Sequence, residues 1–241
     1  MADQIQSSRN TERQLMPRLA AYSGLLGPLL IAAGMLISAL GYSGVEGQSY
    51  SLRNHFVSEL GQLGVSRLAL VFNLSLVIGG ILNSIFLAAL ALQVPGWPRY
   101  LTLLLGLGAS ICGTLVGIFP MNNLQAHITV ALGFFNLGML VALIYSILFL
   151  VDRGGPVPRW LAIPGLLNTA AFIWFNNFPS EFQAGVDFQE GMQGLLTNRP
   201  DFIPLALLEW MVVLGILSWF LVLALYHLSL LPGNTSRRIM R

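Results

Sequence analysis

A few polar side chains lie inside or at the edge of long apolar runs, and these residues could do chemistry. Glu209 lies inside the apolar run from Phe202 to His227, and His127 opens another such run. An acid within a membrane-spanning segment costs about 2.5–3.5 kcal/mol to insert, so it normally faces protein or water and often marks function. A carboxyl and an imidazole at one site can transfer protons or ligate a metal. The sequence therefore indicates a candidate site around Glu209 and His127.

Residues 51–66, "SLRNHFVSELGQLGVS", place further polar side chains between two apolar runs. Apolar residues recur at i, i+4 and i+7 as Phe56, Leu60 and Leu63, and the same spacing on another side holds His55, Glu59 and Gln62. This pattern predicts an amphipathic helix that lies flat at the membrane surface, buries its Phe56 face and turns its His55/Glu59 face elsewhere. The later stretch 179–200 predicts a second such helix, with apolar residues Phe182, Val186, Met192 and Leu196.

Six apolar runs are long enough to position these residues in a membrane, because a bilayer core needs roughly 20 helical residues. The 241-residue chain is 55% hydrophobic and 9% charged, whereas soluble domains are about 25% charged. Composition and run length together predict an all-α integral membrane protein with six transmembrane helices. The expected spans are Leu19–Gly41, Leu68–Leu92, Tyr100–Phe119, His127–Val151, Trp160–Phe178 and Phe202–His227.

The distribution of arginine predicts the orientation of these spans. With the N-terminus inside, nine of the twelve basic residues lie in short inner segments, and only Arg53, Arg67 and Arg199 lie outside. Because cytoplasmic loops carry the excess of basic residues, both termini should be cytoplasmic, and the plasma (inner) membrane is the expected location. The expected organisation is a cytoplasmic tail (1–18), a six-helix transmembrane domain (19–227) and a second cytoplasmic tail (228–241).

Small residues recur on one face of two spans. The third span has Gly106, Ser110, Gly113 and Gly117, and the first has Gly27, Gly34, Ser38 and Gly41. Faces of this kind let neighbouring helix backbones approach closely, so we expect both spans to pack through them.

The predicted topology brings the candidate residues to the same outer end of the bundle. We expect them to line one outward-facing cavity as a ligand-binding site: Ser58, Glu59, Asn73, His127 and Glu209. Plainer interpretations stay open. Glu209 can be a packing device that is hydrogen-bonded to Asn73 or to an outer arginine, His127 can simply be solvated, and Glu59 can pair with His55 one turn away. If Glu209 has no cation beside it, its burial favours an uncharged carboxyl.

No metal site and no cofactor are predicted. His227 lies at the opposite end of its span, so only His55 and His127 could meet, and Glu59 or Glu209 would have to complete a metal site. The chain has no lysine, which excludes a retinal or pyridoxal Schiff base. Phosphate-loop, nucleophile-elbow and zincin motifs are absent from the sequence. A net charge of +2 with arginines spread over the loops does not indicate nucleic acid.

Several short motifs resemble a known family. "SELG" (Ser58–Gly61), "FN" (Phe72–Asn73), "GIFP" (Gly117–Pro120) and His127 resemble the multi-spanning family called domain of unknown function 998, over roughly residues 25–226. The layout is more distantly similar to six-span proteins of the Frag1/DRAM/Sfk1 type. The resemblance implies that the SELG residues, Asn73 and His127 form an outer-surface constellation. Relatives often place an arginine after the acid or glutamine of the last span, whereas Trp210 follows Glu209 here.

Three functions are compatible with this sequence. The first is a non-enzymatic protein that binds or moves a lipid or small amphiphile in its outward-facing cavity. The second is an intramembrane enzyme that uses Glu209 or His127 as acid, base or metal ligand. The third is a structural subunit of a membrane complex. The expected partners are membrane lipid and a membrane protein or a second copy of the chain.

Overall fold

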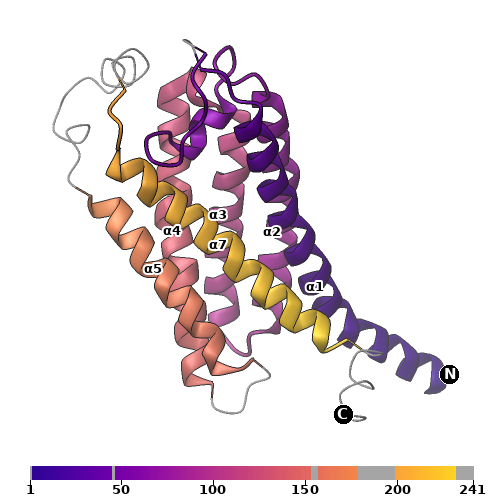
Figure 1. Cartoon of the computed structure of the whole chain (residues 1–241). Helices are drawn as coiled ribbons and strands as arrows, with labels where there is room; N and C mark the ends of the chain where they lie inside the picture. The colour runs from indigo at the N-terminus through magenta and orange to yellow at the C-terminus, as the bar shows by residue number, and fades with distance from the viewer. Residues whose placement is uncertain (1, 45–46, 153–156, 179–198, 232–241) are drawn as a thin grey trace, which may run out of the picture.

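The computed structural model describes residues 2–44, 47–152, 157–178 and 199–231, with side chains from Leu15 onward. Six long helices account for most of these residues (Figure 1). They are α1 (Ala2–Leu40), α2 (Ala69–Gln93), α3 (Pro98–Ile118), α4 (Leu124–Val151), α5 (Ala162–Asn177) and α7 (Pro204–Ser229). Three short 3-10 helices are η1 (Val57–Gly61), η2 (Met121–Asn123) and η3 (Arg159–Leu161). The described part of the chain contains no β-strand.

Local sequence signals explain where several helices begin. Pro98 and Pro204 open α3 and α7, where a residue without a backbone N–H is best tolerated. The side chain of Asn123 accepts a hydrogen bond from the backbone N–H of Ala126 and so caps α4. Within each apolar run a helix gives every interior backbone N–H and C=O a hydrogen-bond partner. Lipid cannot supply such partners, so these runs form helices.

Five of the helices, α1, α2, α3, α4 and α7, are long and apolar enough to cross a membrane. The prediction of an all-α multi-pass membrane protein is therefore confirmed. α5 has only 16 residues, so its role as a sixth crossing stays a prediction, as does the side of the membrane on which each terminus lies. α1 begins at Ala2. The residues expected to form an N-terminal tail (1–18) are therefore helical from Ala2 onward and belong to α1.

The six helices form a closed ring in chain order. Each helix from α1 to α5 packs against the next, and α7 packs against both α5 and α1. This up-and-down order places η1, η2 and the beginnings of α2, α4 and α7 at one end of the bundle, which we call the η1 end (Figure 1). The candidate residues are therefore gathered at the η1 end.

The small-residue faces lie where helices approach most closely. A Cβ atom at Gly117 of α3 would lie 2.6 Å from the backbone oxygen of Asn73 in α2. A Cβ atom at Gly34 of α1 would overlap the side chain of Ser75, also in α2. The prediction that α1 and α3 pack through these glycines is confirmed, and α2 is the shared partner of both helices.

Candidate functional site

A cavity lies inside the helix ring, and its lining is polar mainly at the η1 end. The centre of a water-sized sphere can occupy about 110 Å³ of this cavity, whereas a single water needs only about 10–15 Å³. α1, α2, α3, α4, α7 and η1 all contribute to its wall. At the η1 end the polar residues are Ser58, His127 and Glu209. Most of the remaining wall is apolar, with Asn83 and Ser110 as the polar residues farther in.

The segment that closes the η1 end differs from the predicted amphipathic helix. Only Val57–Gly61 is helical, as a 3-10 helix. Glu59 is 0% exposed and His55 is 2% exposed, whereas Leu63 from the expected apolar face is 43% exposed. The prediction of an amphipathic helix with a buried Phe56 face was therefore wrong, because the buried side chains here include those of the polar face. The second expected helix, in 179–200, falls almost entirely outside the described residues.

Glu59 can be buried because Arg199, from the segment before α7, reaches it. Both guanidinium nitrogens of Arg199 bond the carboxylate, NH1 to Oε1 at 3.0 Å and NH2 to Oε2 at 2.6 Å. The backbone N–H of Phe56 also donates to Oε1 at 2.8 Å. A two-pronged arginine–carboxylate pair with a further donor compensates the desolvation of both charges. The two plainer interpretations, an ion pair of Glu59 with His55 and a hydrogen bond of Glu209 to an outer arginine, are not found among the described residues.

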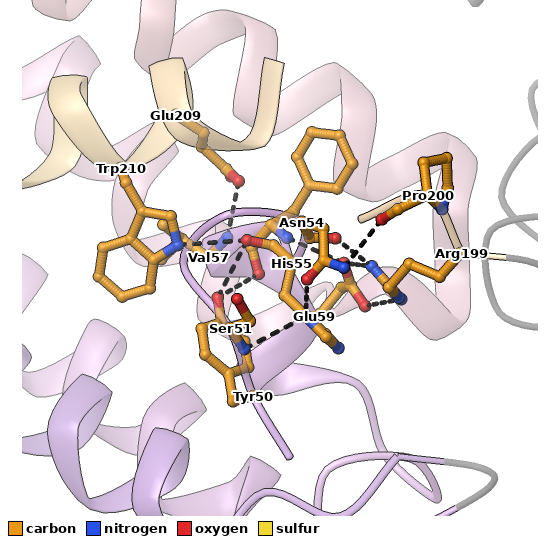
Figure 2. Close-up of polar contacts among 11 residues, drawn as sticks. Tyr50, Ser51, Asn54, His55, Val57, Glu59, Arg199, Pro200, Glu209 and Trp210 are labelled. Atoms are coloured by element: carbon orange, nitrogen blue, oxygen red, sulfur yellow. Dashed lines mark hydrogen bonds and ion pairs between the residues drawn. The ribbon is translucent and has the colours of Figure 1, made fainter. Parts of the chain in front are cut away.

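Four further hydrogen bonds tie residues 53–57 to residues 200–210, around the beginning of α7, and we call this set the clamp; three of the four are drawn in Figure 2. The N–H of Ile203 donates to the Arg53 carbonyl, and the Asn54 amide donates to the Pro200 carbonyl. The Trp210 indole N–H donates to the His55 carbonyl at 3.2 Å. The N–H of Val57 donates to Glu209 Oε2 at 2.7 Å. Trp210 thus serves the clamp.

Glu209 caps η1 across 152 residues of sequence. Its carboxyl accepts the N–H of Val57, the first residue of η1, which has no partner within that helix. Asn73 does not bond Glu209 as expected; its amide donates to the Gly61 carbonyl at the other end of η1. Glu209 and Asn73 therefore both position η1, and only Glu209 also lines the cavity.

His127 lines the cavity with one ring nitrogen already occupied. Its Nδ1 lies 2.9 Å from the backbone oxygen of Phe119. A carbonyl oxygen only accepts, so Nδ1 must have the hydrogen. Nε2 is then the nitrogen left for another molecule, and in the uncharged ring it presents a lone pair. The ring is 6% exposed, so the interpretation of His127 as a solvated residue was wrong.

The structure brings three of the five candidate residues to the cavity: Ser58, His127 and Glu209. Glu59 lies within η1 and Asn73 beside it, and neither of them lines the cavity. Whether any of the five acts on a ligand stays a prediction. Among the described residues no three histidine, cysteine, aspartate or glutamate side chains are grouped as a metal site would require.

Sequence reasoning missed two residues of this region. Arg199 was considered only among the outer arginines that could reach Glu209, and nothing local pointed to Glu59, 140 residues away. Asn83 lies deep in α2, and its buried Oδ1 has no partner within the described chain. An amide in the middle of an apolar span was the available signal for Asn83.

His55 lies in an aromatic enclosure beside the clamp. Its ring centre is 5.3 Å from that of Tyr42 and 5.0 Å from that of Tyr50. Two groups face His55 Nδ1: Asn54 Oδ1 lies 2.9 Å away and can accept a hydrogen from it, and the Ser51 backbone N–H lies 3.3 Å away and can donate to its lone pair. Burial lowers the pKa of His55, and the nearby Glu59 carboxylate only partly offsets this effect. Burial, with a contribution from Glu59, raises the pKa of Tyr42 to about 12.

Acidification should therefore weaken the fold through His55. The folded-state pKa lies below the ordinary value of 6.5, so the unfolded chain binds more protons between these two values. The stabilisation is complete above pH 6.5 and is lost as the pH falls toward the folded-state pKa. We expect melting temperature to fall less between about pH 7.5 and about pH 5.5 in His55→Phe than in the wild type. The other buried histidines are common to both proteins, and equal pH slopes would contradict this role.

Fold and composition define the chain as a multi-pass helical membrane protein. Residues 26–226 match the family described as "Protein of unknown function (DUF998)", and the chain belongs to this family. The match confirms the resemblance seen in the short motifs, whereas the more distant likeness to Frag1/DRAM/Sfk1-type proteins stays a prediction. No curated protein matches the chain, and neither does any solved structure.

Proposed function

We propose that this protein binds a lipid or small amphiphile in the cavity of its helix ring. One observation favours this function most: the cavity has polar side chains at the η1 end and an apolar wall along most of the rest. An amphiphile has the same division between a polar head and an apolar chain. Ligand sites of this type are mostly apolar with a few placed polar groups.

The length of the cavity fits an extended chain. It reaches along α7 from Glu209 to Phe220, and at about 1.5 Å per residue this stretch is about 16 Å long. Phe72, Leu87 and Phe220 belong to its apolar wall. Burial of the ligand's apolar chain would stabilise the complex by about 0.8 kcal/mol per methylene relative to water.

A substitution that fills the cavity should remove the ligand. Ala131 of α4 lines the cavity, whereas its neighbour Leu132 is 50% exposed on the outer face of the ring. We expect Ala131→Phe to lower the amount of amphiphile that copurifies by at least about tenfold, because the ring would occupy the space of the chain. Leu132→Phe is the matched control and should retain it. The measurement is native mass spectrometry of full-length protein in mild detergent. Equal ligand content in two folded variants would contradict the proposal.

We further propose that α5 is a sixth crossing, that both termini are cytoplasmic and that the protein resides in the plasma (inner) membrane. The support is the excess of arginine in the segments on one side. Reporter fusions after Leu92, Val151 and Arg241 should read cytoplasmic, and fusions after Gly47, Asn123 and Gln193 should read external. An external C-terminal reporter would contradict the six-span topology. It would also place the η1 end on the cytoplasmic side, whereas we propose that this end faces outward.

A further inference from the structure

We infer that the polar end of the cavity selects an amphiphile whose head donates a hydrogen bond, a hydroxyl or an amine, over one with an anionic head. This inference rests on the proposed function and specifies its ligand class. It follows from which atoms at the η1 end remain available and from the absence of a cation there among the described residues.

Two of the three polar side chains at this end offer acceptors. His127 uses its Nδ1 hydrogen on the Phe119 carbonyl, so the uncharged ring offers only the Nε2 lone pair to a ligand. Glu209 accepts the Val57 N–H with Oε2, and its carboxyl also lines the cavity. Ser58 completes this end with a hydroxyl that both donates and accepts. A hydroxyl head can therefore donate to His127 or Glu209 and accept from Ser58.

An anionic head meets no compensating charge at this end. The chain has no lysine, and no arginine is among the described residues that line the cavity. Arg199 is the arginine nearest to Glu209 in sequence, but its NH1 and NH2 groups both donate to the Glu59 carboxylate. A carboxylate head would enter a poorly hydrated space beside a second carboxyl group and a nitrogen lone pair. Burial of a charge without a partner is strongly unfavourable.

The test uses four amphiphiles with the same saturated chain: a primary alcohol, its methyl ether, the primary amine and the fatty acid. Each competes with a photoactivatable fatty alcohol for the full-length protein in phosphatidylcholine nanodiscs, and empty nanodiscs correct for partition into lipid. We expect the alcohol and the amine to compete at least about tenfold better than the ether and the acid, the loss expected for one buried hydrogen bond. Labelled peptides should include the cavity-facing residues Val213 and Phe220 of α7.

Two conservative variants assign the selectivity to its residues. His127→Asn can keep a donor for the Phe119 carbonyl while it removes Nε2, so alcohol affinity should fall about tenfold with the melting temperature unchanged. Glu209→Gln can still accept the Val57 N–H but replaces the other carboxyl oxygen with an NH2 donor, so the preference for the alcohol over the acid should narrow.

The outcomes separate this inference from the function on which it rests. If none of the four compounds prevents labelling, or if no cavity peptide is labelled, the proposed function itself is wrong. If labelling maps to the cavity but the acid or the ether competes as well as the alcohol, the amphiphile site stands and the head-group inference is overturned. An unchanged selectivity in both variants would also overturn it, since the head would then lie away from His127 and Glu209.

Discussion

Replacement of Arg199 by methionine should lower the free energy of unfolding by about 3–5 kcal/mol, because it leaves the carboxylate of Glu59 buried without its counter-charge. Glu59 is 0% exposed and the Arg199 side chain only 9%, so water cannot take over the role of the guanidinium. SDS-induced unfolding in mixed micelles, followed by circular dichroism, measures the change.

Two controls test whether charge pairing is the cause. Glu59→Gln in the Arg199→Met background should recover a large part of the loss, since a glutamine oxygen can still accept the Phe56 N–H without a buried charge. Arg53→Met removes an exposed arginine from the clamp but keeps the backbone carbonyl that Ile203 bonds, so it should change stability by less than about 0.5 kcal/mol. If Arg53→Met costs as much as Arg199→Met, general charge balance and not the buried pair is responsible.

Replacement of Gly117 by valine should cost about 3 kcal/mol, at the upper end of what overpacking usually costs. The added Cβ would lie 2.6 Å from the backbone oxygen of Asn73 and 3.0 Å from the Cβ of Leu76. Neither atom can rotate away, so α2 and α3 must separate. Because the Asn73 side chain holds η1 through Gly61, this separation should also disturb the η1 end. Thermal unfolding in detergent measures the loss.

Gly108 of the same helix provides the matched control. A Cβ there would lie 3.0 Å from the terminal Cδ1 of Leu137, which can move by a rotamer change. We expect Gly108→Val to cost less than about 1 kcal/mol, since the gain in helix propensity over glycine partly offsets the contact. If Gly108→Val and Gly117→Val lose similar amounts of stability, the valine side chain itself, and not the close approach of two helices, causes the loss.

Much of the fold could be predicted because its causes are local in the sequence. A long apolar run needs a helix in a membrane whatever surrounds it, so five of the six expected spans reappear as long apolar helices. Small residues such as Gly34 and Gly117 repeat at helical spacing, so the contact face of a helix can be read before its partner is known. The alternation of spans also brought His127 and Glu209 to one end, where both line the cavity.

The tertiary structure decided the features that depend on pairing between residues far apart in the sequence. Periodicity placed Phe56 and Leu63 on an apolar face, but it could not show that Arg199, 140 residues later, makes burial of Glu59 stable. Without that partner a buried carboxylate is unfavourable, so the burial of Glu59 inside η1 could not be read from the local pattern. Likewise, Asn73 bonds Gly61 and Glu209 bonds Val57, although side-chain type suggested that they bond each other. Composition and spacing determine which groups must be buried or paired. Only the packed chain determines which partner each group pairs with, because hydrogen bonds and ion pairs require atoms within about 3 Å of each other.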